Sequence, residues 1–412
     1  MLEVISLEDA CALINDRFVA VGSGVEHVEL DKALGRVAAS GVVSQEGVPP
    51  FDRSTVDGFA VRASDTFGCS DSLPALLELS GEILMGAPPA CTCEPATCVR
   101  IPTGGQVPDG ADAVAMLEYC EDYGDGTIGV ARAVAPGENL VFKNDDVKPG
   151  QTLIEKGVQL KPHHIGTLAS LGETTCAVVT KPRVGIISTG DEIIDISQVP
   201  VASQMRDVNA PMMAAAVTAC AADPVLYGIV PDDYDALLDV VSRAVAECDA
   251  VLVSGGSSAG EKDNTARVLR ELGQLLFHGI AVKPGKPTMC ADISGLPVFG
   301  LPGHPVAAYF MFLELVKPLL IRSAGMEGQK KECGGSKTVG AVLSEGIPSN
   351  HGRAELVAVR LRRNDCGLIA VPVRGKSGLI SQLSDADGYV RIGRDTEGLS
   401  AGANVDVRLF DM

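Results

Sequence analysis

The sequence predicts a multidomain α/β protein, in which a central doubly wound α/β domain is flanked by two small β domains and an elongated connector of mixed helix and strand. The 412 residues allow two to four domains, at roughly 100 to 200 residues each. Residues 181–328 alternate regularly between β-prone and helical segments, which is typical of a parallel sheet covered by helices. Residues 41–139 and 329–412 contain short β-prone runs between turns rich in glycine and proline.

The chain begins with a predicted amphipathic helix. Ser6 and Asp9 have the spacing of a helix-capping box. The apolar face of this helix is formed by Leu7, Ala10, Cys11 and Ile14. A second helix is expected over residues 164–171. We therefore expect residues 1–40 and 140–180 to form one discontinuous connector domain around a β domain of residues 41–139, whose strands are predicted at 59–61, 76–79 and 113–116.

Residues 181–328 are predicted to form the α/β domain. Its strands are expected at 184–188, 225–230, 250–254, 275–282 and 297–301, and its helices at 209–222, 232–246, 263–272 and 305–320. Residues 329–412 are predicted to form a C-terminal β-barrel-like domain with strands at 355–361, 368–373 and 405–409. Ligands of a doubly wound domain bind beyond the carboxyl ends of its strands. The loops at those ends are therefore the candidate site.

Five such loops converge, at residues 188–192, 231–233, 254–263, 283–287 and 301–305. Glycines in these loops let backbone N–H groups approach a phosphate closely. Lys283 and Lys286 are the fixed cations that a chain of net charge −19 needs if it binds an anion. The sequence therefore predicts a phosphate site at this edge of the sheet.

Carboxylates in the same loops would repel an anion unless they hold a hard cation that bridges it, as Mg²⁺ does. The candidates are Asp191, Glu192, Asp232 and Asp263. The alternative is that Asp232 and Asp263 are only helix N-caps. His304 could equally pack within its loop or contact the ligand.

Three other patterns carry little weight. Residues 279–288 resemble a phosphate-binding P-loop, but the spacing is one residue too long and a proline stands where a helix should begin. Residues 256–260 fit the GxSxG pattern of serine hydrolases, but they lie too far beyond the preceding strand for a nucleophile elbow. Cys91, Cys93 and Cys98 lack zinc-site spacing, and we interpret them as ordinary loop residues.

Composition excludes several other classes of protein. The acidic charge and the 4% aromatic content argue against nucleic-acid binding. The apolar runs fall short of the roughly 18 residues of a membrane helix. The acidic start of the chain is unlike a secretory signal, and the 12 scattered cysteines favour reduced thiols, so we expect a cytoplasmic protein.

Six motifs then occur in a characteristic order: PFDRSTVDGFAV at 50–61, IPTGG at 101–105, STGDE at 188–192, GGSSAG at 255–260, KPGKP at 283–287 and LPGHP at 301–305. Arg353 in NHGR and Ser377 in GKSG follow them. On these residues the sequence resembles the molybdopterin molybdenumtransferase (MoeA) family over essentially the whole chain. Members of this family are elongated dimers of four-domain chains.

The resemblance implies that the protein inserts molybdenum into molybdopterin. Its substrate would be adenylated molybdopterin, whose dithiolene sulfurs receive the metal from molybdate while the bond to AMP is hydrolysed with Mg²⁺. The residues that would hold Mg²⁺ or orient water are Asp191 or Glu192, Asp232 or Asp233, and Asp263. Lys283 and Lys286 would bind phosphates or the molybdate oxyanion. The implied substrate-binding residues are Asp57, Thr103, Asp146, Gly255, Gly256, Ser257, Pro302, His304, Pro305, Arg353 and Ser377.

The resemblance also implies a homodimer with composite active sites. The crevice of one protomer would face Asp57 and Thr103, and also Arg353 and Ser377, of its partner. The molybdopterin adenylyltransferase is a possible further partner. Adenylation of molybdopterin and a non-catalytic scaffold role are the alternative functions; against them stand the flanking β domains and the lack of an extra domain.

The sequence departs from the family pattern at three positions. Many members have Asn in place of His304, Val in place of Ser257 and Tyr in place of Phe59. Histidine carries a proton near pH 6.5, so His304 leaves the choice between molybdate and tungstate open.

Overall fold

The computed structural model describes residues 4–22, 24–255, 263–326, 337–365 and 367–410. Their contacts divide the chain into two compact units. The first unit comprises Met1–Ser40, Lys156–Lys161 and Thr175–Met412, and the second comprises Gly41–Glu155 and Pro162–Thr174. The finer division into four domains stays a prediction.

The first unit contains the predicted doubly wound α/β sheet. Its six strands follow the order β16 (Asp223–Val230), β13 (Arg183–Thr189), β17 (Ala250–Ser254), β21 (Leu296–Leu301), β20 (Met289–Ile293) and β18 (Gln274–His278). The first four strands are parallel, while β20 and β18 are antiparallel to their neighbours. The strand predicted over 275–282 is wrong in its second half, because the chain turns at Gly279, where φ is +113°, and β20 was not predicted.

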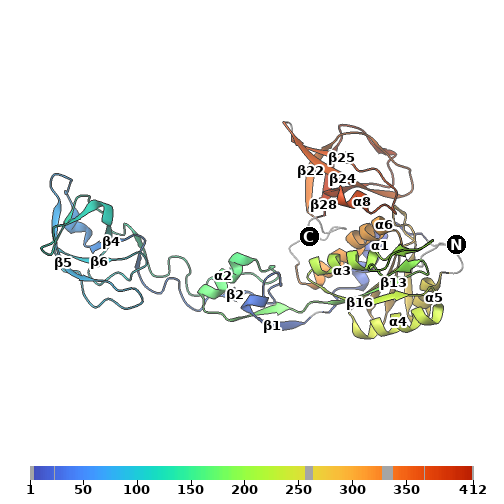
Figure 1. The fold of residues 1–412 in the computed structure, drawn as a ribbon, viewed down its shortest axis with the longest axis horizontal. Coiled ribbons are helices and arrows are strands. Elements are labelled where there is room, and N and C mark those ends of the chain that lie inside the picture. Colours follow the sequence, from blue (N-terminus) through green and yellow to red (C-terminus); the bar gives the residue numbers. More distant parts are fainter. Residues whose placement is uncertain (1–3, 23, 256–262, 327–336, 366, 411–412) are drawn as a thin grey trace. The chain divides into compact units, whose positions relative to one another are not determined.

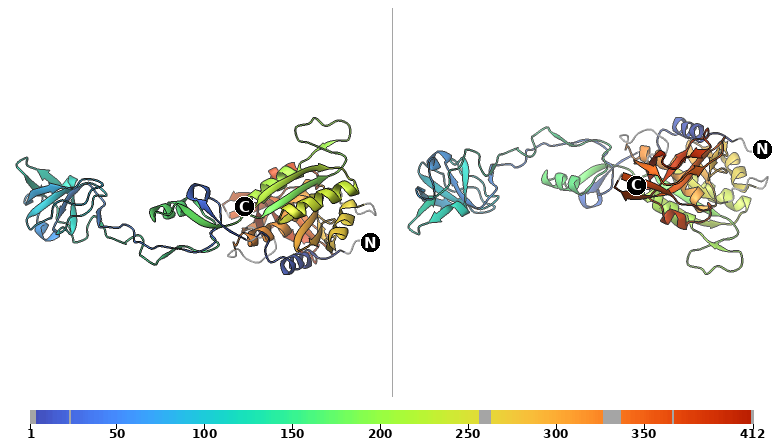
Figure 2. Two further views of the ribbon diagram at one scale, coloured as in Figure 1. Left: turned by 90° about the horizontal axis from the view of Figure 1, so that it is seen from below. Right: turned by 90° about the horizontal axis from the view of Figure 1, so that it is seen from above.

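Helices cover both faces of this sheet, as Figures 1 and 2 show. One face packs against α4 (Tyr234–Glu247) and α5 (Asn264–Leu272). The other packs against α1 (Leu7–Arg17), α3 (Asn209–Ala219) and α6 (Pro305–Met311). The predicted N-cap of α1 is confirmed, because the Ser6 hydroxyl accepts a hydrogen bond from the Asp9 N–H at 3.0 Å, while the Asp9 carboxylate accepts from the Ser6 hydroxyl at 2.6 Å.

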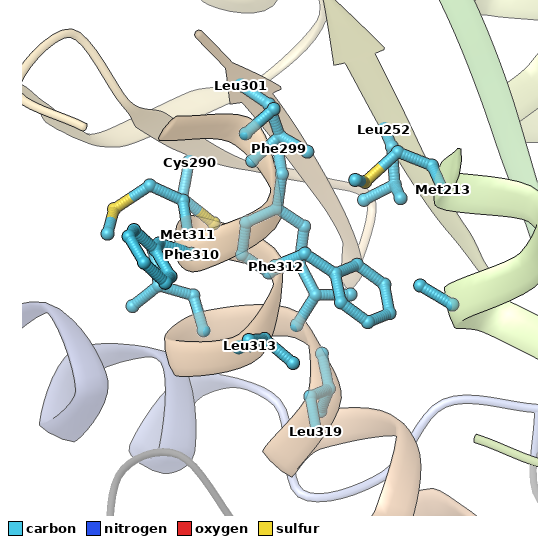
Figure 3. Packing of buried hydrophobic residues seen from close by; sticks show 14 of the residues in the cluster. Met213, Leu252, Cys290, Phe299, Leu301, Phe310, Met311, Phe312, Leu313 and Leu319 are labelled. Carbon is cyan, nitrogen blue, oxygen red and sulfur yellow. The ribbon is translucent and has the colours of Figure 1, made fainter. Parts of the chain in front are cut away.

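The larger core lies between β21 and the helix that follows it (Figure 3). Phe299 and Leu301 of β21 meet Phe310, Phe312 and Leu313, all fully or almost fully buried. Helix α6 continues through one π-helical turn, Phe312–Val316, into α7 (Lys317–Ser323). The predicted helix over 305–320 is therefore continuous but changes its winding within this core.

The π-helical turn carries Glu314 into the interior, with 1% of its surface exposed. Its carboxylate accepts hydrogen bonds from the Tyr389 hydroxyl at 2.8 Å and from Arg408 Nη1 at 2.8 and 3.1 Å. Arg391 Nη1 lies 3.8 Å from the second carboxylate oxygen. Burial and the adjacent carboxylate raise the pKa of Tyr389 well above its usual value, so this phenol remains a hydrogen-bond donor.

The three partners of Glu314 belong to the C-terminal sheet, which closes into the predicted barrel. Its strands are β22 (Thr338–Leu343), β24 (Ala354–Asn364), β25 (Gly367–Pro372), β26 (Gly388–Ile392) and β28 (Asn404–Leu409). They follow the order β24-β25-β22-β28-β26, and β26 pairs back to β24. The short strand β19 (Val282–Lys283), which follows β18 in the chain, pairs in parallel with the start of β24. Strands β22 and β26 were not predicted.

Smaller elements complete the first unit. They are β1 (Val25–Glu29) paired with β12 (Thr175–Val179), β14 (Ile193–Ile194) paired with β15 (Met205–Arg206), β23 (Ile347–Pro348) paired with β27 (Gly398–Leu399), the 3₁₀ turn Leu30–Lys32 and α8 (Ser381–Ser384).

The second unit is built on a six-stranded sheet. Its order is β7 (Ala113–Met116), β4 (Gly58–Val61), β6 (Thr97–Ile101), β5 (Ala75–Glu82), β9 (Thr127–Val130) and β8 (Cys120–Asp122), which contains the three predicted strands. Two short pairs, β3 (Arg53–Ser54) with β10 (Leu140–Val141) and β2 (Val42–Val43) with β11 (Thr152–Ile154), accompany it. Helix α2 (Pro162–Ser170) and the 3₁₀ turns Ala63–Thr66 and Leu117–Tyr119 are its remaining elements. In the described part of the chain, every helix is too short or too polar to cross a membrane.

Glu314→Gln is expected to destabilise the first unit by about 3 kcal/mol, because it leaves the Arg408 guanidinium largely buried without its counter-charge. Thermal and urea unfolding, followed by circular dichroism, would measure the loss. Glu345→Gln is the matched control, because Glu345 pairs with Arg374 where both side chains are solvent-accessible, and this pair is worth at most about 1 kcal/mol. Equal stability of the two variants would contradict the importance assigned to Glu314.

Candidate active site

The carboxyl ends of β13, β17 and β21 border a cavity of about 950 Å³, here called the strand-end cavity. Parallel strands present these ends at one edge of the sheet, so loops far apart in sequence meet there. The lining includes six predicted residues: Glu192, Asp232, Gly255, Pro302, His304 and Pro305. Gly255 is required by the fold, because its φ is +108° and a Cβ would lie 1.9 Å from the Thr189 carbonyl oxygen.

A second cavity of about 960 Å³, here called the lysine cavity, lies between the α/β sheet and the barrel. Five cationic side chains line it: Lys283, Lys286, Arg353, Arg374 and Lys376. Pro302, His304 and Ser377 also line it. One chain thus brings Arg353 and Ser377 to the two predicted lysines. These two residues therefore reach the lysines without a partner protomer, while the composite dimeric site stays a prediction.

The two cavities share a wall formed by Pro287, Pro302, His304 and Gly378. His304 is the N-cap residue of α6, and its Nδ1 lies 3.0 Å from the Ser377 hydroxyl, within hydrogen-bond distance. The Val306 N–H also donates to the Ser377 carbonyl oxygen at 3.2 Å. His304 therefore contacts the barrel and also borders both cavities, and its contact with a ligand stays a prediction.

Lys283 is held by a buried carboxylate that sequence reasoning missed. Its Nζ lies 2.6 Å from Glu355 Oε1, and the Ser349 hydroxyl donates to Glu355 Oε2 at 2.9 Å. Glu355 is 8% exposed and stands two residues after Arg353. The sequence gives no signal for this role, because it depends on the burial of Glu355 beside Lys283.

The loop after Lys283 does not have the structure of a phosphate-binding P-loop, which agrees with the sequence analysis. Thr288 is fully buried, its hydroxyl donates to the Gly285 carbonyl oxygen at 2.6 Å, and a strand rather than a helix begins at Met289. Gly285 has φ of +121°, and a Cβ there would lie 2.7 Å from the Met311 sulfur. The core under α6 thus fixes the path of the backbone that carries both lysines.

Two predicted carboxylates adjoin at the ends of β13 and β16. Asp191 Oδ1 accepts the Asp232 N–H at 3.1 Å. The suggestion that Asp232 caps a helix is wrong, because α4 begins at Tyr234 and Asp233 is its N-cap, accepting the Ala236 N–H at 3.0 Å. Asp232 instead accepts a hydrogen bond from Asn264 Nδ2 at 3.3 Å and remains exposed.

Asp263 does cap a helix, but only one of its oxygens is used. Oδ1 accepts the Ala266 N–H at 3.0 Å, while Oδ2 is buried without a hydrogen-bond partner and lies 3.6 Å from His278 Nε2. Burial, and then the negative charge of Asp232, raise the pKa of the Asp263 carboxyl. Burial thus disfavours the charged form of this carboxyl, and a bound cation would stabilise it.

The four predicted Mg²⁺ ligands do not form a preformed coordination site. Among the described residues, which exclude 256–262, no three acidic, histidine or cysteine side chains form a group that could hold a metal ion. Mg²⁺ retains several water ligands and is commonly held by one or two carboxylates plus substrate phosphates. The adjoining pair Asp191 and Asp232, with Asp263 electrostatically coupled to Asp232, fits that requirement.

In the second unit, the predicted residues Asp57 and Thr103 are brought together. The Thr103 N–H and hydroxyl donate to Asp57 Oδ1 at 2.6 and 2.9 Å, and these two bonds lower the pKa of Asp57. Asp146 is exposed, and its backbone N–H donates to the Val48 carbonyl oxygen at 3.0 Å. Asp57 is therefore a carboxylate already fixed in its charged form.

The predicted substrate-binding residues Gly256 and Ser257, and the GxSxG pattern at 256–260, lie outside the described residues. The cysteine group is different from an ordinary loop, because Cys98 lies within β6 and Cys93 is also buried. Burial raises the pKa of Cys98 to about 12, so its thiol stays protonated at neutral pH.

Comparisons with known proteins cover almost the whole chain. Residues 5–172 match the model described as the MoeA N-terminal region (domain I and II), residues 185–322 match a probable molybdopterin binding domain, and residues 340–410 match the MoeA C-terminal region (domain IV). The molybdopterin molybdenumtransferase of Bacillus subtilis is 33% identical, over 93% of this chain and 90% of that protein. The molybdopterin molybdenumtransferase of Haemophilus influenzae is 32% identical, over 94% of both chains.

A solved structure agrees with these matches. The crystal structure of a molybdopterin biosynthesis MoeA protein from Pyrococcus horikoshii has a TM-score of 0.82 to this chain, at 32% identity over 99% of this chain and 100% of that one. Sequence and fold thus lead to the same conclusion: the chain belongs to the MoeA family of molybdenum cofactor biosynthesis.

Proposed function

We propose that the protein is a molybdopterin molybdenumtransferase that transfers molybdenum from molybdate, or tungsten from tungstate, to the dithiolene of adenylated molybdopterin, with release of AMP. The observation that carries the proposal is the pair of cavities that share a wall, one of them lined by five cations in a chain of net charge −19. Two substrates bound on either side of such a wall would be adjacent.

The lysine cavity suits a small oxyanion. Lys283, Lys286 and Arg353 approach it from the α/β sheet and from the barrel, and each can donate charge-assisted hydrogen bonds. The Nε of Arg353 is buried without a hydrogen-bond partner, so a bound oxyanion would satisfy it. Glu355 fixes Lys283 and offsets part of the positive charge, which favours a bound anion that is released again after transfer.

The strand-end cavity suits the larger, adenylated substrate. Hydrolysis forms a bond from a water oxygen to phosphorus and breaks the phosphoanhydride bond, leaving AMP and the phosphate of molybdopterin. Mg²⁺, when bound, would neutralise charge that develops on the phosphate oxygens. One or two of Asp191, Asp232 and Asp263 would hold it together with the substrate phosphates. The dithiolene sulfurs come from the substrate, so the protein cysteines need no metal role.

Two alternatives predict other behaviour. An adenylyltransferase would consume ATP and form adenylated molybdopterin, and a scaffold would do neither. The decisive experiment incubates the purified protein with adenylated molybdopterin, Mg²⁺ and molybdate, and follows AMP by chromatography. Release of AMP that requires molybdate supports the proposal, whereas release that is independent of molybdate, or absent, rejects it.

We further propose a homodimer in which Asp57 and Thr103 of one protomer complete the site formed by the other protomer's lysine and strand-end cavities. The support is chemical: Asp57 and Thr103 form a preformed, charged hydrogen-bonding pair on the second unit, while the two cavities belong to the first. Such a twofold arrangement gives two equivalent composite sites.

Lys286→Ala is expected to lower molybdate-dependent AMP release about 10- to 100-fold without lowering stability, because its exposed ammonium contributes a charge-assisted contact worth about 1.5 to 3 kcal/mol. Lys283→Ala should lose both activity and about 1 to 2 kcal/mol of stability, since it leaves the buried Glu355 unpaired. Adding Glu355→Gln to Lys283→Ala should restore stability but not activity. Full turnover by the double lysine variant would reject this anion site.

Asp263→Asn preserves helix capping but removes the charge, so it separates capping from cation binding. We expect the Mg²⁺ concentration that gives half-maximal AMP release to rise at least about tenfold, from the loss of one charged ligand. An unchanged Mg²⁺ dependence would leave helix capping as the sole role of Asp263.

The raised pKa of Asp263 gives a second prediction, for the metal-free protein. An acid whose pKa is raised on folding makes the folded state less stable once the pH exceeds the ordinary carboxyl pKa of about 3.9. Asp263→Asn should therefore unfold at an equal or higher temperature than the wild type at pH 7 in EDTA. The difference should vanish below pH 4, where both side chains are neutral.

Mixed dimers test the composite site. Lys283→Ala and Asp57→Ala, each inactive alone, should recover roughly a quarter of wild-type activity when refolded together, because about half the dimers are mixed and each has one intact site. Lys283→Ala mixed with Arg353→Ala is the control; it should not recover, since both residues line one cavity of the same chain. Verified mixed dimers of the first pair without activity would place the complete site within one chain.

A further inference from the structure

The strand-end cavity contains buried hydrogen-bonding atoms that the proposed function leaves unused. Ser188 Oγ, Thr189 Oγ1 and Asn209 Oδ1 are buried without a hydrogen-bond partner, and all three residues line this cavity. The three residues are 2%, 2% and 6% exposed. Buried polar atoms without partners are rare in folded proteins, and at the edge of a cavity they point to a bound ligand.

The orientation of the Asn209 amide is fixed by the protein. Its Nδ2 donates to the Gly303 carbonyl oxygen at 2.9 Å and to the Ser254 hydroxyl at 2.8 Å. A carbonyl oxygen only accepts hydrogen bonds, so the reversed amide would place two oxygens against each other. Oδ1 is therefore held as a free acceptor.

The local fold holds this acceptor rigidly at the edge of the sheet. Asn209 is the first residue of α3, and the turn before it is fixed by Asp207, whose carboxylate accepts the Ala210 N–H at 3.0 Å. Its partner Ser254 ends β17 directly beside Ser188 of β13, in register. Gly303, its other partner, belongs to the loop that also carries Pro302 and His304 of the shared wall.

A fixed acceptor selects against part of the proposed substrate. Ionised phosphate oxygens only accept hydrogen bonds, so they are repelled by Asn209 Oδ1. The heterocycles of the substrate, by contrast, carry amino and ring N–H groups. Serine and threonine hydroxyls can donate or accept, so Ser188 and Thr189 can bind whichever ring atoms adjoin that N–H.

We propose that Asn209 is a substrate-binding residue whose Oδ1 accepts a hydrogen bond from an N–H at the edge of the substrate's heterocycle, with Ser188 and Thr189 binding the adjacent ring atoms. The choice of ligand rests on the proposed function. Both the pterin and the adenine of adenylated molybdopterin carry an amino group, and the experiment below distinguishes them.

Equilibrium binding with paired ligands tests this without any turnover. One pair is AMP and purine riboside 5′-monophosphate, which lacks the amino group; the other is 6-hydroxymethylpterin and its 2-desamino analogue. Wild-type protein is expected to bind the amino form about 10- to 100-fold more tightly in at least one pair, measured by calorimetry or pterin fluorescence. The pair that is discriminated identifies the ring.

Asn209→Leu keeps a similar side-chain volume but removes the acceptor, and it should bind the two members of that pair within about twofold of each other. Ser254→Ala removes one internal partner of Asn209 but keeps the Gly303 bond, so discrimination should largely persist. Gln204→Leu is the matched control; it removes an amide from the same cavity, one whose Oε1 accepts the Val201 N–H, and should leave discrimination unchanged. Thermal unfolding would verify that each variant is folded.

Absence of discrimination in both pairs by the wild type would overturn the inference, and so would discrimination that survives in folded Asn209→Leu. These outcomes are independent of AMP release. A protein that discriminates the amino ligands but releases no AMP in the presence of molybdate would reject the proposed function alone.

Discussion

The buried carboxylate of Glu314 is the interaction on which the rest of the first unit depends. The helix that carries it packs on the α/β sheet, and the carboxylate is bonded to Tyr389 and Arg408 of the barrel. The lysine cavity lies where those two bodies meet, because Lys283 and Lys286 come from the connection between β18 and β20 of the α/β sheet and Arg353 directly precedes β24 of the barrel. Burying an unpaired carboxylate costs free energy. The barrel is therefore held in the position that keeps Tyr389 and Arg408 bonded to Glu314. The geometry of the lysine cavity is thus set by a contact outside it.

One of the cations of the lysine cavity is also held in place by a buried carboxylate, in this case Glu355. An acidic chain repels anions over distances up to about a Debye length, roughly 8 to 10 Å at physiological salt. Local cations must therefore be numerous and fixed, and five of them line one cavity. Glu355 fixes Lys283 at 2.6 Å, and the short pairing of β19 with β24 brings the two residues opposite each other. Main-chain pairing of β19 with the barrel thus positions the Lys283 side chain.

Sequence periodicity was sufficient for the fold because most strands and helices here have one strongly apolar face. It was insufficient for β20 (Met289–Ile293), which directly follows the loop that carries the two lysines. It was also insufficient for distinguishing Asp232 from its neighbour Asp233 as the cap of α4. The lysines, Arg353 and His304 could be predicted from motifs. Glu355 and Asn209 could not, because their significance lies in burial and in which hydrogen-bonding atoms remain unpaired, and neither is visible in a single sequence.

The wall between the cavities links these features. His304 caps α6 and bonds to Ser377 of the barrel, while Gly303 beside it accepts the Asn209 amide and Pro302 lines both cavities. Three consecutive positions of one loop therefore contact the helix, the barrel and both cavities. Closely packed side chains transmit displacements. If ligand binding in one cavity moves this loop, the shape of the other cavity therefore changes as well. In the proposed transfer reaction, this short loop would directly connect the two bound substrates.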